Sequence, residues 1–470
     1  MASNQHHLLC NRASNLPEHI FRQYDIRGIV SNELTAGVAH DIGLAIGSEI
    51  IAAGQNSVMI GRDGRLSGPK ITSSIRSGIS KTGCEVIDIG VVPTPVLYYA
   101  AKTMGNGSGV MVTGSHNPKD YNGIKMVIAG HTLYGEGIQK LKNRILTGDL
   151  VAGKKLGKQK ERAVTWEYIN SVDEGIELGR KLKVVVDAGN GVAGDCAPDL
   201  FREIGCSVDE VYCEINGHFP NHHPDPSKPE NLQDLINRVK KIGAHIGLAF
   251  DGDGDRLGVV TPKGKIINAD RQLMLYAREM LKKNPGAKVL YDVKCTKHME
   301  SFIKAAGGEP EMCQTGHALV KKKMKETNAA LAGEMSGHIF FNDRWHGFDD
   351  GLYTGARLLE ILSNTNLNAD ELFDAIPDSI STPEINVKID ENKKSPIMSY
   401  LNKTVSGKFP NGRIITIDGI RVELENGWGL IRPSNTSPVL VLRFEADTEN
   451  DLSQIKEAFE SWLEEATRSI

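Results

Sequence analysis

The sequence predicts an α/β protein with three related α/β domains, each built on a mixed sheet, and a smaller α+β domain at the C-terminal end. Three apolar runs, each typical of a buried strand, end at an aspartate: Asp63, Asp187 and Asp292. Downstream of each, a second apolar run enters a polar, glycine-rich loop, as in "VMVTGSHN", "IGLAFDGDGDR" and "ALAGEMSGH". After Pro377 the pattern changes to short strands, turns and two candidate helices.

Segments with helical periodicity separate these strands, for example "DLINRVKKIGA" and "RQLMLYAREMLKK". Strands that alternate with helices form parallel or mixed sheets with crossover connections. Ligands of such sheets gather at the carboxyl ends of the strands. We therefore place the domains at residues 1–160, 161–263, 264–376 and 377–470, with their functional loops at strand ends.

The composition is ordinary for a globular protein. The 470 residues are 24% charged and 40% hydrophobic, long enough for roughly three or four domains with separate cores. The net charge of -4 provides no global positive field for nucleic acid or an anionic membrane surface. We therefore expect neither of these partners, and an anionic ligand must be held by local groups.

Cysteine usage and the N-terminal sequence indicate the compartment. The 7 cysteines are odd in number, scattered, and never spaced as C-x-x-C, which is typical of a reducing environment. The first residues, "MASNQHHLLCNRASNLPEHIF", lack a basic segment followed by an apolar core, and no run approaches membrane-spanning length. We expect a cytoplasmic protein.

A serine stands where the second apolar run of the first domain stops. The stretch "GVMVTGSHNPKDYNGIKMV" leaves Ser115 at an irregular turn, near a sheet edge that a ligand could reach. Position alone does not make Ser115 a nucleophile, and it becomes a candidate phosphate acceptor only together with the loops described below. Taken alone, the stretch is better explained by Ser115 and Asn117 capping a turn before Pro118.

The strongest chemical signal is "DGDGDR", which packs Asp251, Asp253 and Asp255 into five residues directly after a strand. Such carboxylates repel one another unless a cation is present, and hard oxygen ligands on a glycine backbone suit Mg²⁺. A calcium loop of the EF-hand type fails, because Arg256 and Pro262 stand where it needs glycine and glutamate. A phosphatase of the aspartate-nucleophile type is a nearer alternative, although Asp255 stands where such motifs usually carry a small or hydroxylic residue.

The motif "GEMSGH" alternates Glu334, Ser336 and His338. In an extended loop these three side chains point the same way. A carboxylate, a hydroxyl and an imidazole can together grip vicinal sugar hydroxyls. Alone, the motif is as well explained by a capping box or a surface histidine.

The motif "RPSNTSP" places Arg432 before the donors Ser434, Asn435 and Thr436. A fork-shaped cation beside several donors is how a loop cradles a phosphate. Alone, the same residues fit a turn with side-chain caps equally well. No Walker A sequence or well-formed G-x-G-x-x-G occurs, so nucleotide binding has little support.

The motifs "TGSHNPKDYNGIK", "DGDGDR", "GEMSGH" and "RPSNTSP" follow one another in this order along the chain. With them the sequence resembles the α-D-phosphohexomutase family over essentially its whole length. It is most similar to the bacterial phosphomannomutase/phosphoglucomutase branch. The glucosamine branch typically carries glutamine in place of Met335 and an alanine in the serine loop.

The resemblance implies four domains around a central cleft and a mutase activity. Phospho-Ser115 would give its phosphoryl group to a hexose phosphate, forming a hexose 1,6-bisphosphate that turns end over end and returns its other phosphate. Hexose 1-phosphate and hexose 6-phosphate of mannose and glucose would thereby interconvert. One Mg²⁺ per chain, held by Asp251, Asp253, Asp255 and a serine-bound oxygen of Ser115, would be the electrophile.

The resemblance also implies roles for individual residues. Lys125 is the expected general base, with His116 and His338 as alternatives, and Arg27 is expected to lower the pKa of Lys125. Arg256 is expected to steady the metal loop or the phosphate. The expected substrate contacts are Tyr24, Lys294, His317, Glu334, Ser336, His338, Arg432, Ser434, Asn435 and Thr436.

Two other classes of function stay open beside the mutase. A metal-dependent sugar phosphatase with the same loops would release inorganic phosphate, which a mutase conserves. A noncatalytic metal-binding protein would carry no phosphoserine. For the mutase we expect a small phosphosugar as substrate, hexose 1,6-bisphosphate as activator, and a monomer or weak dimer.

Overall fold

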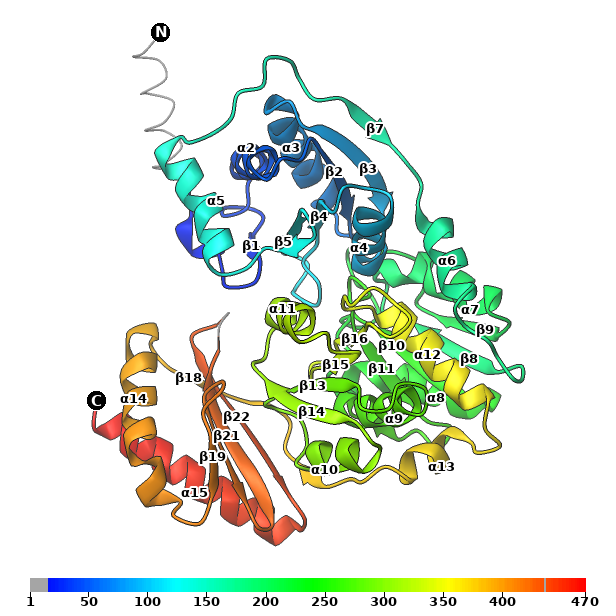
Figure 1. Cartoon of the computed structure of the whole chain (residues 1–470), viewed down its shortest axis with the longest axis vertical. Coiled ribbons are helices and arrows are strands. Elements are labelled where there is room, and N and C mark those ends of the chain that lie inside the picture. The colour runs from blue at the N-terminus through cyan, green and yellow to red at the C-terminus, as the bar shows by residue number, and fades with distance from the viewer. Residues whose placement is uncertain (1–15, 435–436) are drawn as a thin grey trace. The chain divides into compact units, whose positions relative to one another are not determined.

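The structure is a computed structural model, and it describes residues 16–434 and 437–470. The chain forms two compact units, and its course through them can be followed in Figure 1. The first unit comprises the chain up to Asn268 together with Ser336–Phe373, and the second comprises Ala269–Met335 together with Asp374–Ile470.

The first unit begins with a mixed sheet in the strand order β1-β5-β4-β2-β3-β7, with β6 paired to β5. Its strands are β1 (Ile26–Ile29), β2 (Ser57–Arg62), β3 (Glu85–Val91), β4 (Gly109–Val112), β5 (Tyr121–Ile128), β6 (His131–Thr132) and β7 (Gln159–Glu161). Strand β2 is parallel to β3 and β4, whereas β5 is antiparallel to β1 and β4. The connection from β4 to β5 carries Ser115.

A second mixed sheet in this unit has the order β12-β11-β10-β8-β9. Its strands are β8 (Lys183–Asp187), β9 (Ser207–Val211), β10 (Ile246–Phe250), β11 (Leu257–Val260) and β12 (Ile266–Ile267). Strand β8 is parallel to β9 and β10, and β10 forms an antiparallel pair with β11. The turn between β10 and β11 carries the "DGDGDR" motif.

Helices separate the strands of this unit. They are α2 (Ala36–Ala52), α3 (Gly68–Lys81), α4 (Thr94–Thr103), α5 (Glu136–Thr147), α6 (Thr165–Asp173), α7 (Ala197–Glu203), α8 (Gln233–Ile242), α12 (Gly351–Ser363) and α13 (Ala369–Asp374), with the short strand β16 (Ile339–Phe341) before α12. In α3, Ile71, Ile75 and Ile79 recur every fourth residue and are fully buried. Helix α8 confirms the predicted helix "DLINRVKKIGA", and it ends at Gly243 with a left-handed φ of 61°.

The second unit begins with helix α9 (Ala269–Leu281), which confirms the second predicted helix. Strand β13 (Lys288–Asp292) then pairs in parallel with β14 (Glu309–Cys313) and β15 (Leu331–Gly333). Helices α10 (His298–Ala305) and α11 (His317–Thr327) connect these strands. This is the βαβ arrangement that alternating strands and helices predict.

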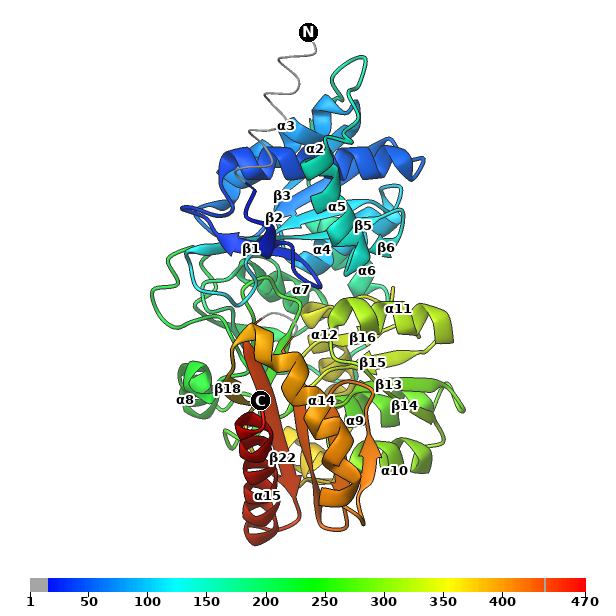
Figure 2. The same cartoon turned by 90° about the vertical axis from the view of Figure 1, so that its left-hand side faces the viewer.

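The remainder of the second unit is an antiparallel sheet in the order β17-β22-β21-β20-β19, with β18 paired to β22. Its strands are β17 (Ile380–Ser381), β18 (Ile385–Lys388), β19 (Arg413–Ile415), β20 (Ile420–Leu424), β21 (Gly427–Pro433) and β22 (Val439–Ala446). Helices α14 (Glu391–Lys408) and α15 (Glu449–Arg468) lie beside this sheet (Figure 2). Phe459 and Trp462 of α15 are fully buried in the core between them. The change of pattern after Pro377 is thus a change to an α+β fold.

The first three sheets share one arrangement of strands. In each, a strand that ends at an aspartate or is followed by one (β2, β8 and β13) lies between two parallel neighbours: β3 and β4, β9 and β10, and β14 and β15. The predicted fold class, three related α/β domains and a smaller α+β domain, is therefore confirmed. The central cleft and the domain boundaries near residues 160, 263 and 376 stay predictions.

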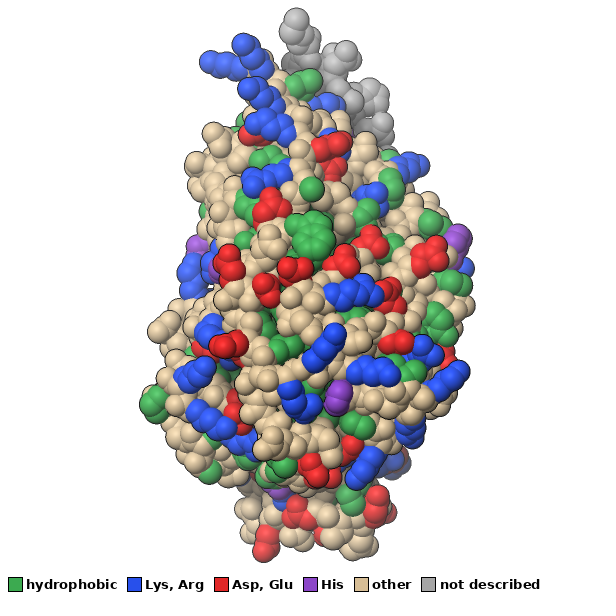
Figure 3. Space-filling view, turned by 90° about the vertical axis from the view of Figure 1, so that its right-hand side faces the viewer, with side chains coloured by type: hydrophobic (Ala, Val, Ile, Leu, Met, Phe, Trp, Pro, Cys, Tyr) green, Lys and Arg blue, Asp and Glu red, His purple; other side chains and the backbone are tan. Residues whose placement is uncertain are grey.

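The surface agrees with the charge balance of the sequence. Figure 3 shows one face on which basic and acidic side chains are interspersed, as a net charge of -4 suggests. Within the described part of the chain, no helix has both the length and the apolar character that crossing a bilayer requires.

Candidate active site

Ser115 lies in the loop between β4 and β5, beside the acidic loop of the second sheet. Its Oγ donates a hydrogen bond to Oδ2 of Asp251 at 3.0 Å and lies 3.1 Å from Nδ1 of His116. Its backbone is left-handed, with a φ of 48°, which is uncommon for a residue with a Cβ atom. The structure therefore brings together a serine and an aspartate that the sequence separates by 136 residues.

The acidic loop is buried. Asp251, Asp253 and Asp255 are each 0% exposed, and one carboxylate oxygen of each lies within 4.8 Å of the others. The glycines between them make this possible. Gly254 has a φ of 76°, and a Cβ atom at Gly252 would lie only 2.3 Å from a backbone oxygen. That oxygen is the carbonyl of Ser115, so Gly252 permits the two loops to meet.

Lys125 on β5 reaches into this acidic cluster. Its Nζ lies 2.7 Å from Oδ2 of Asp253 and 2.5 Å from Oδ2 of Asp255. The Oδ1 atoms of both aspartates are buried without a hydrogen-bond partner, and that of Asp255 faces Nε2 of His338 at 3.4 Å. Burial and the neighbouring charges of Asp255 and Asp253 raise the pKa of Asp251 well above its ordinary value. The cluster thus has surplus negative charge and spare hard oxygen atoms, the donor set that fits Mg²⁺.

The expected lowering of the pKa of Lys125 is wrong for this arrangement. Burial alone would lower the pKa of Lys125, but the carboxylates of Asp253 and Asp255 outweigh it and raise the pKa well above its ordinary value. Arg27, the expected cause of a lowered pKa, instead donates a hydrogen bond to Asn117. The sequence could not show that two carboxylates face this ammonium group.

His116 has the opposite shift. Burial, together with the positive charges of Arg256 and Arg27, lowers its pKa well below the ordinary value. The imidazole is therefore neutral near pH 7 and is a weaker base than a free histidine. Its Nδ1 already lies within 3.1 Å of Oγ of Ser115.

Arg256 and His338 border the acidic cluster. The backbone N–H of Arg256 donates to Oδ1 of Asp251 at 3.2 Å, and its Nε donates to Nε2 of His338 at 3.1 Å. Oγ of Ser336 lies 3.0 Å from the other ring nitrogen of His338. These contacts place Arg256 and His338, from two distant motifs, beside the same carboxylates, and Ser336 beside His338.

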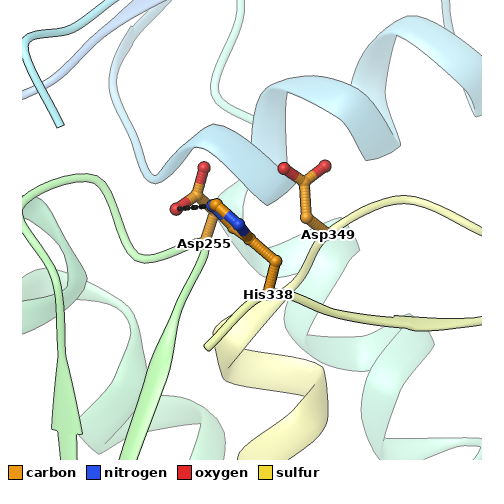
Figure 4. A group of neighbouring side chains, drawn as sticks. All are labelled: Asp255, His338 and Asp349. Atoms are coloured by element: carbon orange, nitrogen blue, oxygen red, sulfur yellow. Dashed lines mark ion pairs between the residues drawn. The ribbon is translucent and has the colours of Figure 1, made fainter. Parts of the chain in front are cut away.

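Asp349 is a neighbour that sequence reasoning missed. Figure 4 shows it gathered with His338 and Asp255, and one ligand atom of each lies within 4.8 Å of the others. His338 Nε2 is 3.4 Å from Oδ1 of Asp255. Because this group shares Asp255 with the acidic loop, it extends the same site. The paired aspartates in "GFDDGLY", among apolar residues, are the signal that could have revealed it.

The second unit holds several other candidates, each with contacts inside that unit. Nζ of Lys294 lies 2.6 Å from Oε1 of Glu384. Oε1 of Glu334 accepts a hydrogen bond from the backbone N–H of Gly316 at 2.6 Å. His317 follows directly and begins α11. The loops that carry Glu334 and His317 are therefore joined, as a shared binding surface would require.

Arg432 lies near the end of β21, and its Nε donates to Oδ2 of Asp418 at 3.0 Å. Oγ of Ser434 accepts the backbone N–H of Ser437 at 3.2 Å, which gives this loop the side-chain cap of a turn. The other predicted residues of the motif, Asn435 and Thr436, lie outside the described residues.

Two predictions about substrate binding stay predictions, the contact of Tyr24 and the shared grip of "GEMSGH". Tyr24 is half-buried just before β1, which carries Arg27. Glu334 belongs to the second unit, whereas Ser336 and His338 belong to the first. The single grip expected of "GEMSGH" therefore stays a prediction.

Comparison with known proteins identifies the class of enzyme to which this fold and site belong. Family models described as phosphoglucomutase/phosphomannomutase alpha/beta/alpha domains I, II and III and C-terminal domain match residues 18–151, 166–264, 268–380 and 384–461. These four models leave only short connections and the two ends of the chain unmatched. The class is that of the phosphohexomutases, which are isomerases.

The relatives agree along nearly the whole chain. The chain is 54% identical to the phosphomannomutase/phosphoglucomutase of Pseudomonas aeruginosa over 459 residues, 98% of each chain. It is 51% identical to the phosphoglucomutase of Neisseria meningitidis over 453 residues, 96% of this chain and 98% of that one. A crystal structure of a family protein from Burkholderia thailandensis matches with a TM-score of 0.91 at 48% identity, covering 96% and 98%. The chain belongs to the phosphoglucomutase/phosphomannomutase family.

Proposed function

We propose that this enzyme interconverts hexose 1-phosphate and hexose 6-phosphate, with glucose and mannose as its sugars. The observation that most supports this proposal is the hydrogen bond from Oγ of Ser115 to Asp251, at 3.0 Å. It puts a hydroxyl that can hold a phosphoryl group beside three carboxylates that can hold a cation. Phosphoryl transfer depends mainly on such positioning and charge neutralisation. The relatives' names support both sugars, and none of those relatives is named a phosphatase.

In the proposed reaction, Ser115 carries a phosphoryl group at the start of each cycle. The bond from phosphorus to Oγ breaks as a bond to the free hydroxyl of the hexose phosphate forms, and a base takes the hydroxyl proton. The resulting hexose 1,6-bisphosphate turns end over end. Its other phosphoryl group returns to Ser115, and the proton is given back. A bound Mg²⁺ would neutralise the charge on the transferring group.

The base that takes the hydroxyl proton is one of three candidates: His116, Lys125 and His338. His116 is placed for proton transfer by its position beside Oγ of Ser115, and its lowered pKa makes the neutral imidazole a weak base. Lys125 can serve only where its proton is no longer held by Asp253 and Asp255. We further propose that the enzyme acts in the cytoplasm as a monomer or weak dimer.

Phosphorus NMR tests the proposed activity directly. Glucose 1-phosphate or mannose 1-phosphate, with Mg²⁺ and a trace of hexose 1,6-bisphosphate, should be converted to the 6-phosphate without loss of ester phosphate. Appearance of inorganic phosphate in proportion to enzyme would instead identify a phosphatase. An unchanged spectrum would identify a noncatalytic protein.

We expect glucose and mannose phosphates to be processed with comparable efficiency. The intermediate must be read in both orientations by one grip, so Glu334 and Ser336 should contact hydroxyls away from C1 and C6. Such a grip tolerates either epimer at C2. Values of kcat/KM for the two 1-phosphates check this expectation. If one sugar is inert, the grip reads C2 and this assignment is wrong.

Arg432→Ala is expected to lower kcat/KM by roughly 30- to 150-fold, because a lost charge-assisted hydrogen bond costs about 2 to 3 kcal/mol. In the proposed reaction Arg432 holds the phosphate that is not reacting, so the variant should also release the bisphosphate more often. Steady-state kinetics over a range of hexose 1,6-bisphosphate concentrations should therefore show a stronger need for activator.

Arg413→Ala is the matched control for this prediction. Arg413 lies on β19 of the same sheet, is exposed, and pairs with Glu300 and Glu423. It should keep the kcat/KM and activator dependence of the wild type. Should Arg432→Ala behave like this control, the remote phosphate is held elsewhere and "RPSNTSP" is only a turn.

A further inference from the structure

Arg65 binds the backbone of the loop that carries Ser115. Its side chain is 0% exposed. Nη1 donates to the carbonyl oxygens of Pro118 at 2.6 Å and Tyr121 at 3.0 Å. Nη2 donates to the carbonyl oxygens of Ser115 at 2.7 Å and Asn117 at 2.6 Å. One guanidinium group thus ties together four backbone positions between Ser115 and Tyr121.

Asp63, the strand-end aspartate of the first repeat, anchors both Arg65 and the start of this loop. Its Oδ2 accepts from Nε of Arg65 at 3.1 Å, from Oγ1 of Thr113 at 2.8 Å and from the backbone N–H of Gly114 at 3.1 Å. Oγ1 of Thr113 in turn accepts the backbone N–H of Ser115 at 2.8 Å. Asp63 therefore stabilises the serine loop in this domain, a role that the proposed reaction does not use directly.

Phe219 and His223, in the segment that follows β9 of the second sheet, contact Arg65 and the serine loop. The ring of Phe219 lies 5.4 Å from the guanidinium carbon of Arg65, a cation–π distance. His223 contacts the carbonyl oxygen of His116, the residue after Ser115. The serine loop is thus held from two sides, by its own domain and by the one that carries the acidic loop.

We propose that Arg65 is a positioning residue for phosphoryl transfer, acting through the backbone of the serine loop. This inference rests on the proposed role of Ser115 as phosphate carrier. The left-handed backbone at Ser115 is disfavoured and persists only where its surroundings over-determine it. A planar guanidinium has five N–H donors in fixed directions, enough for four carbonyls and a carboxylate at once. A lysine has three donors and no plane, so it cannot replace this set.

The test compares Arg65→Lys with Arg76→Lys. Arg76 lies on α3 of the same domain and pairs with Asp88, so it controls for loss of a guanidinium group. In Arg65→Lys, kcat should fall about 100-fold, the loss expected when a reacting atom is misplaced by about an ångström. KM for the hexose 1-phosphate should stay near the wild-type value. Hydrogen exchange of the backbone amides from 113 to 121 should become faster, and the control should show neither change.

Thr113→Val provides a second variant should Arg65→Lys fail to fold. It removes the hydroxyl that links Asp63 to the backbone of Ser115 while keeping the side-chain size. Its kcat should also fall, and the amide of Ser115 should exchange faster. A folded variant with wild-type kcat, or with lower kcat but unchanged exchange, overturns the proposal.

The exchange measurement also separates this inference from the proposed function. If phosphate mapping places the phosphoryl group on a residue other than Ser115, the role of Ser115 fails. Faster exchange in Arg65→Lys would still show that Arg65 holds the loop. Unchanged exchange beside a phosphorylated Ser115 would refute the role of Arg65 alone.

Discussion

Ser115→Ala is expected to keep its fold and to lose nearly all mutase turnover, because the proposed phosphate carrier is gone. Alanine has the same Cβ atom as serine and so adds no backbone strain at a φ of 48°. The lost hydrogen bond to Asp251 leaves that carboxylate its contact with the backbone N–H of Arg256. Coupled assays of 6-phosphate formation measure kcat, and circular dichroism checks the fold.

Ser73→Ala is the control for this prediction. Ser73 is an exposed residue of α3 in the same domain, and its replacement should leave kcat unchanged. Wild-type turnover in Ser115→Ala would remove the phosphoserine from the mechanism.

Removing Mg²⁺ is expected to lower turnover about as much as Ser115→Ala does. Chelation should abolish turnover, because the charge on the transferring phosphoryl group would then face three buried carboxylates without a neutralising cation. Asp253→Asn should weaken Mg²⁺ binding by at least about tenfold, since even outer-shell partners of a metal contribute that much. Titration calorimetry with Mg²⁺ measures the dissociation constant.

Asp209→Asn controls for the loss of a carboxylate elsewhere. Asp209 lies on β9 and pairs with Arg238, so its variant should bind Mg²⁺ like the wild type. Full turnover in metal-free buffer, or unchanged Mg²⁺ affinity in Asp253→Asn, would leave the metal proposal without support.

Much of the fold could be predicted because its signals are local. Each repeat places an apolar strand before an aspartate, and the structure puts β2, β8 and β13 between parallel neighbours. The amphipathic helices also follow from residue spacing alone. Strand order does not, since it depends on pairings between segments far apart in the chain.

For the candidate site too, the local motifs could be predicted from the sequence and the contacts between them could not. Ser115 and the three aspartates can be recognised from residue type and spacing within short motifs. The contacts that decide their chemistry are long-range. Lys125 meets Asp253 and Asp255 across 128 and 130 residues, which reverses the expected pKa shift.

Long-range contacts also hide residues that belong to no motif. Asp349 joins Asp255 and His338 only through the folded chain. Arg65 looks like a surface residue in "GRDGRLSG", yet its guanidinium is buried beneath the serine loop. Residue type and spacing cannot reveal such partners, because burial and pairing arise from tertiary structure.

The central claim is that Ser115 carries the phosphoryl group through the cycle. Dephosphorylated enzyme should be incubated with hexose 1,6-bisphosphate labelled in its phosphates, then digested and mapped by mass spectrometry. The account predicts one labelled phosphate per chain, on the peptide that contains Ser115, and its loss when unlabelled hexose 1-phosphate is added. Label on another residue, or rapid turnover by an enzyme that never acquires label, would contradict it.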